Sequence, residues 1–228
     1  MSTSGTYTFN PSLGEVTVYA YQLIGIRPTA LLQEHIDAAR TSTNMMFTRW
    51  SNQGVNLWQV DLVQVPLVAG TSTYSVDANT VVILDAFIRT VTGSSQTDRI
   101  ILPISRTEYS SYPNKNQQGF PTTFWFDRLL SPTVTLWPVP DGSQTYLEYY
   151  RVIRLQDANM TGTQQMDIPA IWLEAMVYGL AQRLAVIWAP DRAAGLKALA
   201  DESYNIAAAQ NVETAQQYIS PQISGYWR

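Results

Sequence analysis

The 228-residue chain contains no cysteine, and this absence removes whole classes of chemistry. Disulfide bonds, thiolate nucleophiles and zinc–thiolate sites are all excluded. Histidine is nearly absent too: His35 is the single one, and it lies in a predicted helix. Because a Ser–His–Asp triad needs partners held around the imidazole, a solvated or core-edge side chain is the favoured interpretation of His35.

Charge is also scarce. Charged residues make up 14% of the chain, against roughly 25% in a typical soluble domain. Interface cores are depleted of charge and enriched in aromatic residues, so this composition favours a subunit of an assembly. The net charge of −4 comes without a visible basic patch, which argues against a protein that reads DNA sequence.

Motifs for cofactors, metals and membranes are missing as well. The chain has no glycine-rich phosphate loop, no HExxH pattern and no EF-hand loop, so we predict no cofactor and no metal site. Uninterrupted apolar runs, such as residues 81–84, are far too short to span a bilayer, and the polar N-terminus lacks the features of a signal peptide. We therefore expect no membrane partner, and synthesis in the cytoplasm.

Helical patterns occur at both ends of the chain. Ser12 and Glu15 form a capping box that predicts a helix to about Leu23. Three more helices are predicted: one from residue 28 to the glycine at 54, one from residue 167, and one from residue 190 to about 211. Between them the period changes to two, which predicts an antiparallel sheet of about six strands, with Asp141-Gly142 as the turn between the last two.

The predicted fold class is therefore α+β. It is a discontinuous four-helix bundle, made of two N-terminal and two C-terminal helices, with a central antiparallel β insertion and an extended C-terminal tail. The predicted division is residues 1–56 for the N-terminal arm and first two helices, 57–160 for the β domain, 161–211 for the last two helices, and 212–228 for the tail.

The stretch PTTFWFDRLLSPTVTLWPVPDG, residues 121–142, carries the densest aromatic cluster. Rings like these can line a sugar site, and Asp127, Asp141 and Glu148 are nearby carboxylates of the kind that glycosidases use. Alternation places Trp125 on the sheet face opposite Phe124 and Phe126, however, which suggests a sheet that is covered on both sides. We predict that Trp125 and Trp137 lie at a subunit or tail interface, and that the protein is not an enzyme.

A series of short motifs runs through the chain, and their order and spacing are more specific than any one of them. They are residues 45–50 and 54–58, Gly70 with Tyr74, residues 103–109, 113–115, 119 and 121–122, residues 135–140 and 149–151, residues 167–169 with Trp172, and residues 179–181 and 183–185. In this arrangement the chain resembles the head-to-tail adaptor proteins of tailed bacteriophages. The family is also described as tail accessory, tail tubular protein A-like or packaged-DNA stabilisation proteins. The resemblance covers roughly residues 12–210.

The resemblance implies a structural protein of the virion neck. Such adaptors form a ring, typically a dodecamer, from their helical bodies beneath the portal protein. The ring extends the DNA channel, helps to retain packaged DNA and offers a platform to the downstream tail or nozzle protein. Double-stranded DNA is then a passing cargo that is not read by sequence.

In such adaptors the C-terminal segment reaches the portal, which gives the tail of this chain a predicted role. Its candidate portal-binding residues are Tyr218, Ile219, Ile223, Tyr226, Trp227 and Arg228. Tyr, Trp and Arg dominate interface hot spots, although a strap packed on its own domain is an equal alternative. Two further readings stay open: another tail-tube or baseplate component, and a carbohydrate-binding or glycan-hydrolysing protein.

Overall fold

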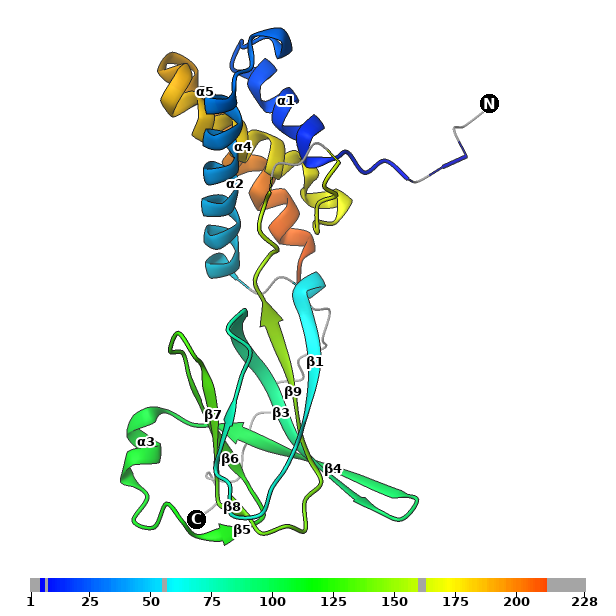
Figure 1. Ribbon diagram of the computed structural model, residues 1–228, viewed down its shortest axis with the longest axis vertical. Helices are drawn as coiled ribbons and strands as arrows, with labels where there is room; N and C mark the ends of the chain where they lie inside the picture. The colour runs from blue at the N-terminus through cyan, green and yellow to red at the C-terminus, as the bar shows by residue number, and fades with distance from the viewer. Residues whose placement is uncertain (1–4, 7, 55–56, 160–162, 213–228) are drawn as a thin grey trace, which may run out of the picture.

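The computed structural model describes residues 5–6, 8–54, 57–159 and 163–212, and it is elongated, with helices at one end and a sheet at the other (Figure 1). The helices are α1 (Leu13–Leu23), α2 (Gln33–Gln53), α3 (Arg106–Ser111), α4 (Leu173–Trp188) and α5 (Pro190–Gln210), with 3-10 turns at Pro28–Ala30, Leu57–Gln59 and Ala170–Trp172. The strands are β1 (Val60–Pro66), β2 (Thr73–Ser75), β3 (Thr80–Thr92), β4 (Ser95–Pro103), β5 (Gln118–Gly119), β6 (Thr123–Asp127), β7 (Thr133–Trp137), β8 (Val139–Pro140) and β9 (Tyr146–Ile153).

Helix α4 is the centre of the helical end. It packs against α1, α2 and α5, and its side chains Met176, Leu180 and Leu184 are fully buried. By length and composition alone, Ala170–Trp188 could cross a membrane. Its inner side is buried among three neighbouring helices, as in a core helix, while Ile171, Val186 and Ile187 are exposed.

The sheet end has a hydrophobic core of its own. Seven strands form one curled sheet in the order β1-β9-β3-β4-β6-β7-β2, and β5 pairs with β8 in a separate two-stranded sheet. The main sheet buries Ile88, Leu136 and Leu147 together with Phe124. All its neighbouring pairs are antiparallel except β4 and β6, which run parallel through Leu102↔Thr123 and Pro103↔Phe124.

The predicted fold class was wrong. The structure has five helices and a large seven-stranded mixed sheet with its own core, not a helix bundle with an antiparallel β insertion. The segment between β4 and β6 contains α3 and carries the chain across, so that β6 joins β4 in parallel, where the sequence predicted only antiparallel pairs. The expected hairpin at Asp141-Gly142 is also absent, since β7 pairs with β6 and β2 while β9 pairs with β1 and β3.

Polar contacts connect the two ends of the molecule at the narrow waist. The Asn44 side chain in α2 accepts from the Ala158 backbone N–H (2.8 Å) and donates to its carbonyl (3.2 Å). Gln59 Nε2 donates to Asp167 Oδ2 (2.9 Å), and the Leu57 N–H donates to Asn211 Oδ1 (3.0 Å). These contacts fix where the sheet begins relative to the helices.

Candidate functional site

The aromatic stretch of residues 121–142 holds the α3 segment against the sheet. Tyr109 stacks on Trp125 with ring centroids 5.5 Å apart, and Tyr112 stacks on Trp137 at 4.1 Å. The Trp137 indole N–H also donates to the Asn114 carbonyl (3.0 Å). Phe124 lies on the other face of β6, buried in the sheet core, as the alternation predicts.

Trp125 and Trp137 are half-buried, so each ring keeps an accessible part beside α3. Part of the surface of each ring is therefore buried in contacts within the same molecule. Their role at a subunit or tail interface stays a prediction.

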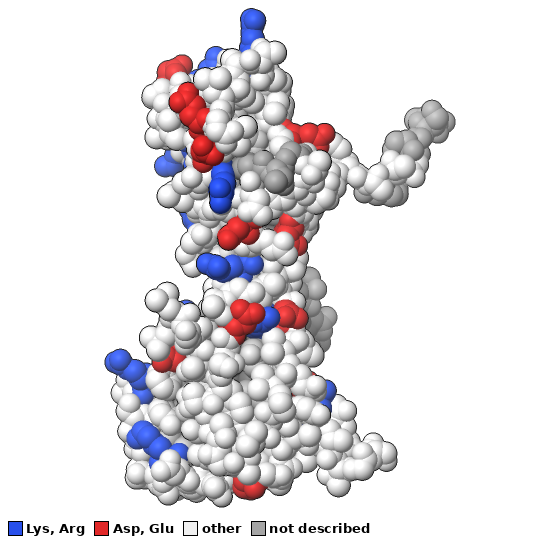
Figure 2. Space-filling view, viewed as in Figure 1, with Lys and Arg blue, Asp and Glu red and all other residues white. Residues whose placement is uncertain are grey.

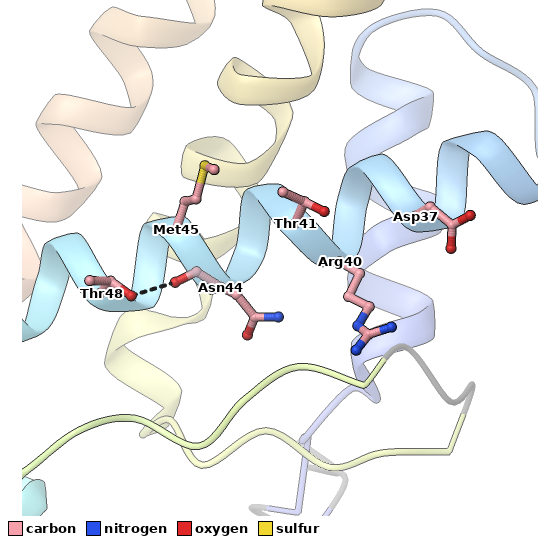
Figure 3. Close-up of a pocket in the computed structure, with 6 residues that line it drawn as sticks. All are labelled: Asp37, Arg40, Thr41, Asn44, Met45 and Thr48. Atoms are coloured by element: carbon pink, nitrogen blue, oxygen red, sulfur yellow. Dashed lines mark hydrogen bonds between the residues drawn. The ribbon is translucent and has the colours of Figure 1, made fainter. Parts of the chain in front are cut away.

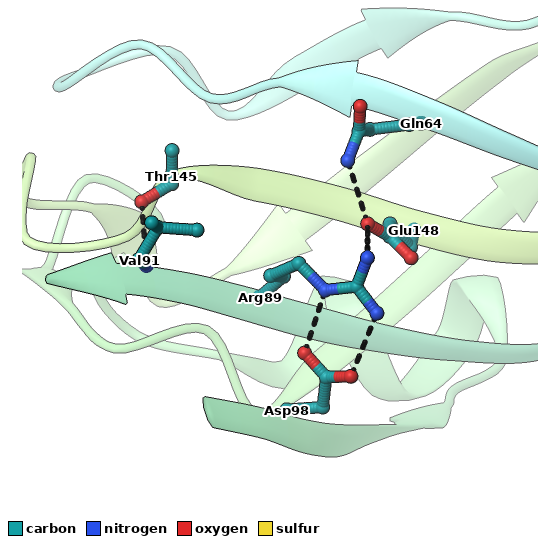
Figure 4. Close-up of polar contacts among 6 residues, drawn as sticks. All are labelled: Gln64, Arg89, Val91, Asp98, Thr145 and Glu148. Carbon is teal, nitrogen blue, oxygen red and sulfur yellow. Dashed lines mark hydrogen bonds and ion pairs between the residues drawn. The ribbon is translucent and has the colours of Figure 1, made fainter. Parts of the chain in front are cut away.

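A row of polar side chains crosses four neighbouring strands on the outward face of the sheet (Figure 4). Arg89 in β3 binds Asp98 in β4 through two hydrogen bonds of 2.8 Å and reaches Glu148 in β9 at 2.5 Å. Gln64 in β1 donates to the same Glu148 oxygen at 2.7 Å. The row therefore joins β1, β9, β3 and β4.

The charged groups of this polar row interact mainly with one another. Glu148 is 1% exposed, and its second carboxylate oxygen has no hydrogen-bond partner in the described structure. The hydrogen bonds from Arg89 lower the pKa of Asp98, and the bond to Asp98 raises the pKa of Arg89. Because this one guanidinium serves two carboxylates, the row has no spare cation for an anionic ligand.

An apolar row lies next to the polar one on the same outward face. Leu62 in β1 is paired with Tyr150 in β9, and the Tyr150 ring contacts Phe87 in β3 with centroids 6.4 Å apart. Phe87 is in turn paired with Ile100 in β4. Leu62, Ile100 and Leu102 are 44%, 66% and 62% exposed, so the face presents apolar side chains to its surroundings.

Two grooves mark the helical end. The first, of about 620 Å³, follows the outer side of α2 and is lined by Asp37, Arg40, Thr41, Asn44, Met45 and Thr48 (Figure 3). The second, of about 860 Å³, lies between α1 and α4 and is lined mainly by apolar groups, among them Phe9, Tyr19 and Tyr178, with Glu15 and Glu174. Apolar lining with few charges is typical of surfaces that receive another protein segment.

The visible face carries its charges unevenly. Figure 2 shows acidic and basic side chains over the helical end and the waist, while much of the sheet end is white. Within the described residues, no group of His, Asp and Glu side chains could hold a metal ion. Of the candidate carboxylates, Asp141 accepts from Ser143 in its turn, Glu148 belongs to the polar row, and Asp127 is paired with Thr133 at the end of β6.

His35 lies at the core edge at the start of α2. Its ring stacks on Trp188 at the end of α4 (4.3 Å) and meets Tyr21 of α1 edge-on (5.3 Å). Its Nδ1 accepts from the Leu32 N–H (3.1 Å), which makes it the capping side chain of α2. This is a structural arrangement, with no nucleophile or carboxylate among the contacts that the structure gives to the ring.

The predicted portal-binding residues, Tyr218, Ile219, Ile223, Tyr226, Trp227 and Arg228, lie outside the described residues. Sequence reasoning missed the polar row and the apolar row beside it. Strand pairing brings their members together from four separate segments, so no local motif could have indicated them.

Comparison with known families decides between the classes left open by the sequence. Residues 21–224 match the model of the SU10 adaptor protein family. The chain belongs to this family. Membership makes it a structural adaptor protein of a bacteriophage, with a place in the virion neck, and confirms the resemblance seen in the motifs.

The match to the SU10 adaptor family covers both ends of the molecule, since residues 21–224 include α2, α4 and α5, the sheet and the waist, but only the last residues of α1. It points to a structural role, not an enzymatic one. No curated protein sequence matches the chain.

Proposed function

We propose that this SU10 adaptor acts as a head-to-tail adaptor, with copies that form a ring beneath the portal protein. Family membership is the observation that carries the proposal. The ring, a dodecamer as in the adaptors that the chain resembles, extends the DNA channel and helps to retain packaged DNA. Its far end offers a platform to the downstream tail or nozzle protein.

The surface of the described chain supports assembly. Exposed apolar side chains occur on α2, α4 and α5 and on the outward sheet face, for example Met45, Val186, Ile206 and Ile100. A stable monomer rarely exposes large contiguous apolar patches, and such patches mark interaction sites. The elongated shape, with helices at one end and the sheet at the other, gives each copy two ends, and we assign one to the portal and the other to the tail protein (Figure 1).

The charge balance supports DNA as passing cargo. A lining rich in Lys and Arg would neutralise phosphates and hold the duplex, because each phosphate contact releases counterions and adds affinity. The chain has 14 Lys and Arg against 18 Asp and Glu. A channel built from such subunits lets the duplex slide, with no sequence recognition.

The tail residues 212–228 are proposed to bind the portal. Deleting them should abolish co-sedimentation with purified portal rings, while circular dichroism and thermal melting of the free subunit stay close to those of the full chain. As a matched control, Tyr226→Ala with Trp227→Ala should weaken portal binding, whereas Thr214→Ala with Gln216→Ala should not. Undiminished co-sedimentation of the deleted chain would contradict this role.

Trp125 tests the interface prediction on the sheet. We expect Trp125→Ala to weaken ring formation on portal strongly, and to lower the melting temperature of the free subunit only slightly. Tyr109→Ala is the control, because it removes the ring that stacks on Trp125 and leaves the indole in place. A collapse of subunit stability in Trp125→Ala would assign the indole to the fold instead.

A further inference from the structure

The outward part of the sheet has two open edges. Among the described residues, β1 is the last strand on one side and pairs with β9 alone. Strand β4 pairs with β3 along Ser95–Ile101 on one side, but with β6 only at Leu102 and Pro103 on the other. The β3–β4 hairpin projects from the body in Figure 1, with the free edge of β4 along it. Open edges of this kind are templates for strand addition.

The backbone directions on β4 follow from its bonds to the β6 region. The Leu102 N–H donates to Thr122 O (3.0 Å) and the Ile104 N–H to Phe124 O (2.9 Å). Since N–H groups alternate between the two sides of a strand, those of Gln96, Asp98 and Ile100 point to this same side. In the described structure they find no strand there.

The same reasoning applies to β1. The Leu67 N–H donates to Thr145 O, directly before β9, at 3.0 Å. Alternation therefore points the N–H groups of Val60, Leu62 and Gln64 away from β9, to the open edge. Each edge thus presents three outward N–H groups over seven residues, Val60–Pro66 on β1 and residues 95–101 on β4.

The strand directions match as well. The pairs β1–β9, β9–β3 and β3–β4 are all antiparallel, so β4 runs opposite to β1. A second copy placed beside the first would therefore bring its β1 antiparallel to the free edge of β4, and the alternation would continue unbroken. A contact that joins two different surfaces in this way closes into a ring when the rotation permits.

We propose that a second copy of this chain docks by strand addition, with its β1 on the free edge of β4. The proposal rests on the ring put forward above and names one of its subunit contacts, in addition to contacts between helical bodies. The register that pairs all three outward N–H groups places Val60 opposite Ile100, Leu62 opposite Asp98, and Gln64 opposite Gln96. Main-chain hydrogen bonds give affinity in this mode of recognition.

The apolar row gives the docking its side-chain component. It begins with Leu62 on one open edge and ends with Ile100 on the other. Joining β1 of one copy to β4 of the next in this register places Val60 directly opposite Ile100, with Leu62 diagonal to Ile100 on the same face. Asp98 brings no unpaired charge to the junction because Arg89 already binds it.

The absence of native cysteine makes the test direct. Within one copy β1 and β4 are separated by β9 and β3, about 14 Å at the usual strand spacing, which is too far for a disulfide. In the Val60→Cys, Ile100→Cys double variant, oxidation of rings assembled on portal should give a ladder of covalent multimers that a reductant removes. The pair Leu62→Cys, Ile100→Cys covers the neighbouring register.

The control pair is Val60→Cys with Leu130→Cys, because Leu130 is 98% exposed in the turn between β6 and β7. It should give no ladder. A ladder from neither β1–β4 pair in intact rings overturns the inference and leaves the ring itself standing. If no ring forms on portal, the proposed function fails. Strand addition is then tested by oxidising the free double-cysteine protein at high concentration. A ladder of covalent multimers supports strand addition, and the absence of a ladder overturns it.

A backbone variant gives an independent readout. Gln96→Pro removes an outward N–H without touching the bonds to β3, whereas Gln96→Ala removes the same side chain and keeps the N–H. We expect ring formation to fall several-fold further in Gln96→Pro than in Gln96→Ala, with equal circular dichroism of the free subunits. Equal assembly of the two variants would overturn the inference.

Discussion

Arg89 is the residue on which the outward sheet face depends most. Its guanidinium binds Asp98 and Glu148 at once and so ties β3 to both of its neighbours. Removing one partner of a buried ion pair costs far more than the pair contributes, because the other charge stays buried and unpaired. The effect of a substitution in this row should therefore follow the burial of the group left behind.

We predict that Arg89→Met lowers the free energy of unfolding much more than Asp98→Asn does. The first variant leaves the buried Glu148 carboxylate without its cation, while the second removes a carboxylate that is partly solvated. Urea denaturation of both variants measures the difference. Equal losses would contradict the view that Glu148 is the group that needs Arg89.

The pH dependence of the pair has a definite sign. Arg89 lowers the pKa of Asp98 below its ordinary value of 3.8, so the folded state holds this carboxylate ionised more firmly than the unfolded chain does. The resulting stability is fully present at pH values above the pKa of Asp98 in the unfolded chain. It is lost as the pH falls through the lower pKa that Asp98 has in the folded state. Asp98→Asn should flatten that part of the acid unfolding curve, and only slightly because the pair is exposed to solvent.

His35 offers a second test at the scale of single residues. It occupies the third position of α2 and accepts from the Leu32 N–H, the role that Glu or Gln plays in a capping box. Both His35→Gln and His35→Leu lose the stack on Trp188, but only glutamine keeps an acceptor for the cap. We expect the leucine variant to be less stable than the glutamine variant by about 1 kcal/mol, the usual value of a lost cap, in urea denaturation. A leucine variant as stable as the glutamine variant would show that the ring acts by packing alone.

At the scale of helices, close packing of α2 on α4 depends on Gly179. A Cβ at this position would lie 2.7 Å from Met46 Sδ, and Met46 is fully buried. Gly195 in α5 is the matched case, since a Cβ there would meet nothing. Alanine gains about 1 kcal/mol over glycine in a helix interior, while overpacking costs about 1–3 kcal/mol.

We therefore predict opposite signs for the two glycine substitutions. Gly195→Ala should raise the midpoint of thermal unfolding, and Gly179→Ala should lower it because the clash outweighs the gain in propensity. Differential scanning calorimetry measures both. Stabilisation of both variants would mean that Met46 moves aside without cost.

The helices could be predicted from the sequence because their signals are local. The capping box of Ser12 and Glu15 opens α1 as expected. The helical period over residues 28–54 predicted an apolar stripe that is buried at Ala39, Thr43, Met46 and Trp50 but exposed at Leu32 and Ile36, and the helix starts later than expected since Pro28–Ala30 forms a separate 3-10 turn. Six residues are too few to show a helical period, which is why α3 was not predicted from the sequence.

The sheet could be predicted only in part, since alternation locates strands without naming their partners. Most strand segments were found, but β4–β6 pairing depends on the crossover through α3, and the expected β7–β9 hairpin does not exist. The polar row of Gln64, Glu148, Arg89 and Asp98 depends on these strand pairings, so it could not be predicted from the sequence. Non-local pairing is the information that a local pattern lacks.

At the scale of the whole molecule, the described residues form two hydrophobic cores that lie at opposite ends of the molecule (Figure 1). One contains side chains of α1, α2, α4 and α5, and the other those of the curled sheet. The chain passes between them at the waist, where Asn44 and Gln59 make polar contacts, and the helices α1, α2, α4 and α5 make few direct contacts with the strands in the described structure. Few apolar contacts at a junction favour independent opening of the parts on either side.

We predict that the two cores respond separately to truncation. Leu180→Ala in α4 and Leu136→Ala in β7 each remove a fully buried side chain, at a cost of about 2–5 kcal/mol to the core that loses it. Amide hydrogen exchange read by mass spectrometry should then speed up in peptides from α1, α2, α4 and α5 in the first variant, and in peptides from β3, β6, β7 and β9 in the second. Faster exchange throughout the chain in either variant would show a single cooperative unit, in which a tail protein that pulls on the sheet end would strain the helical end as well.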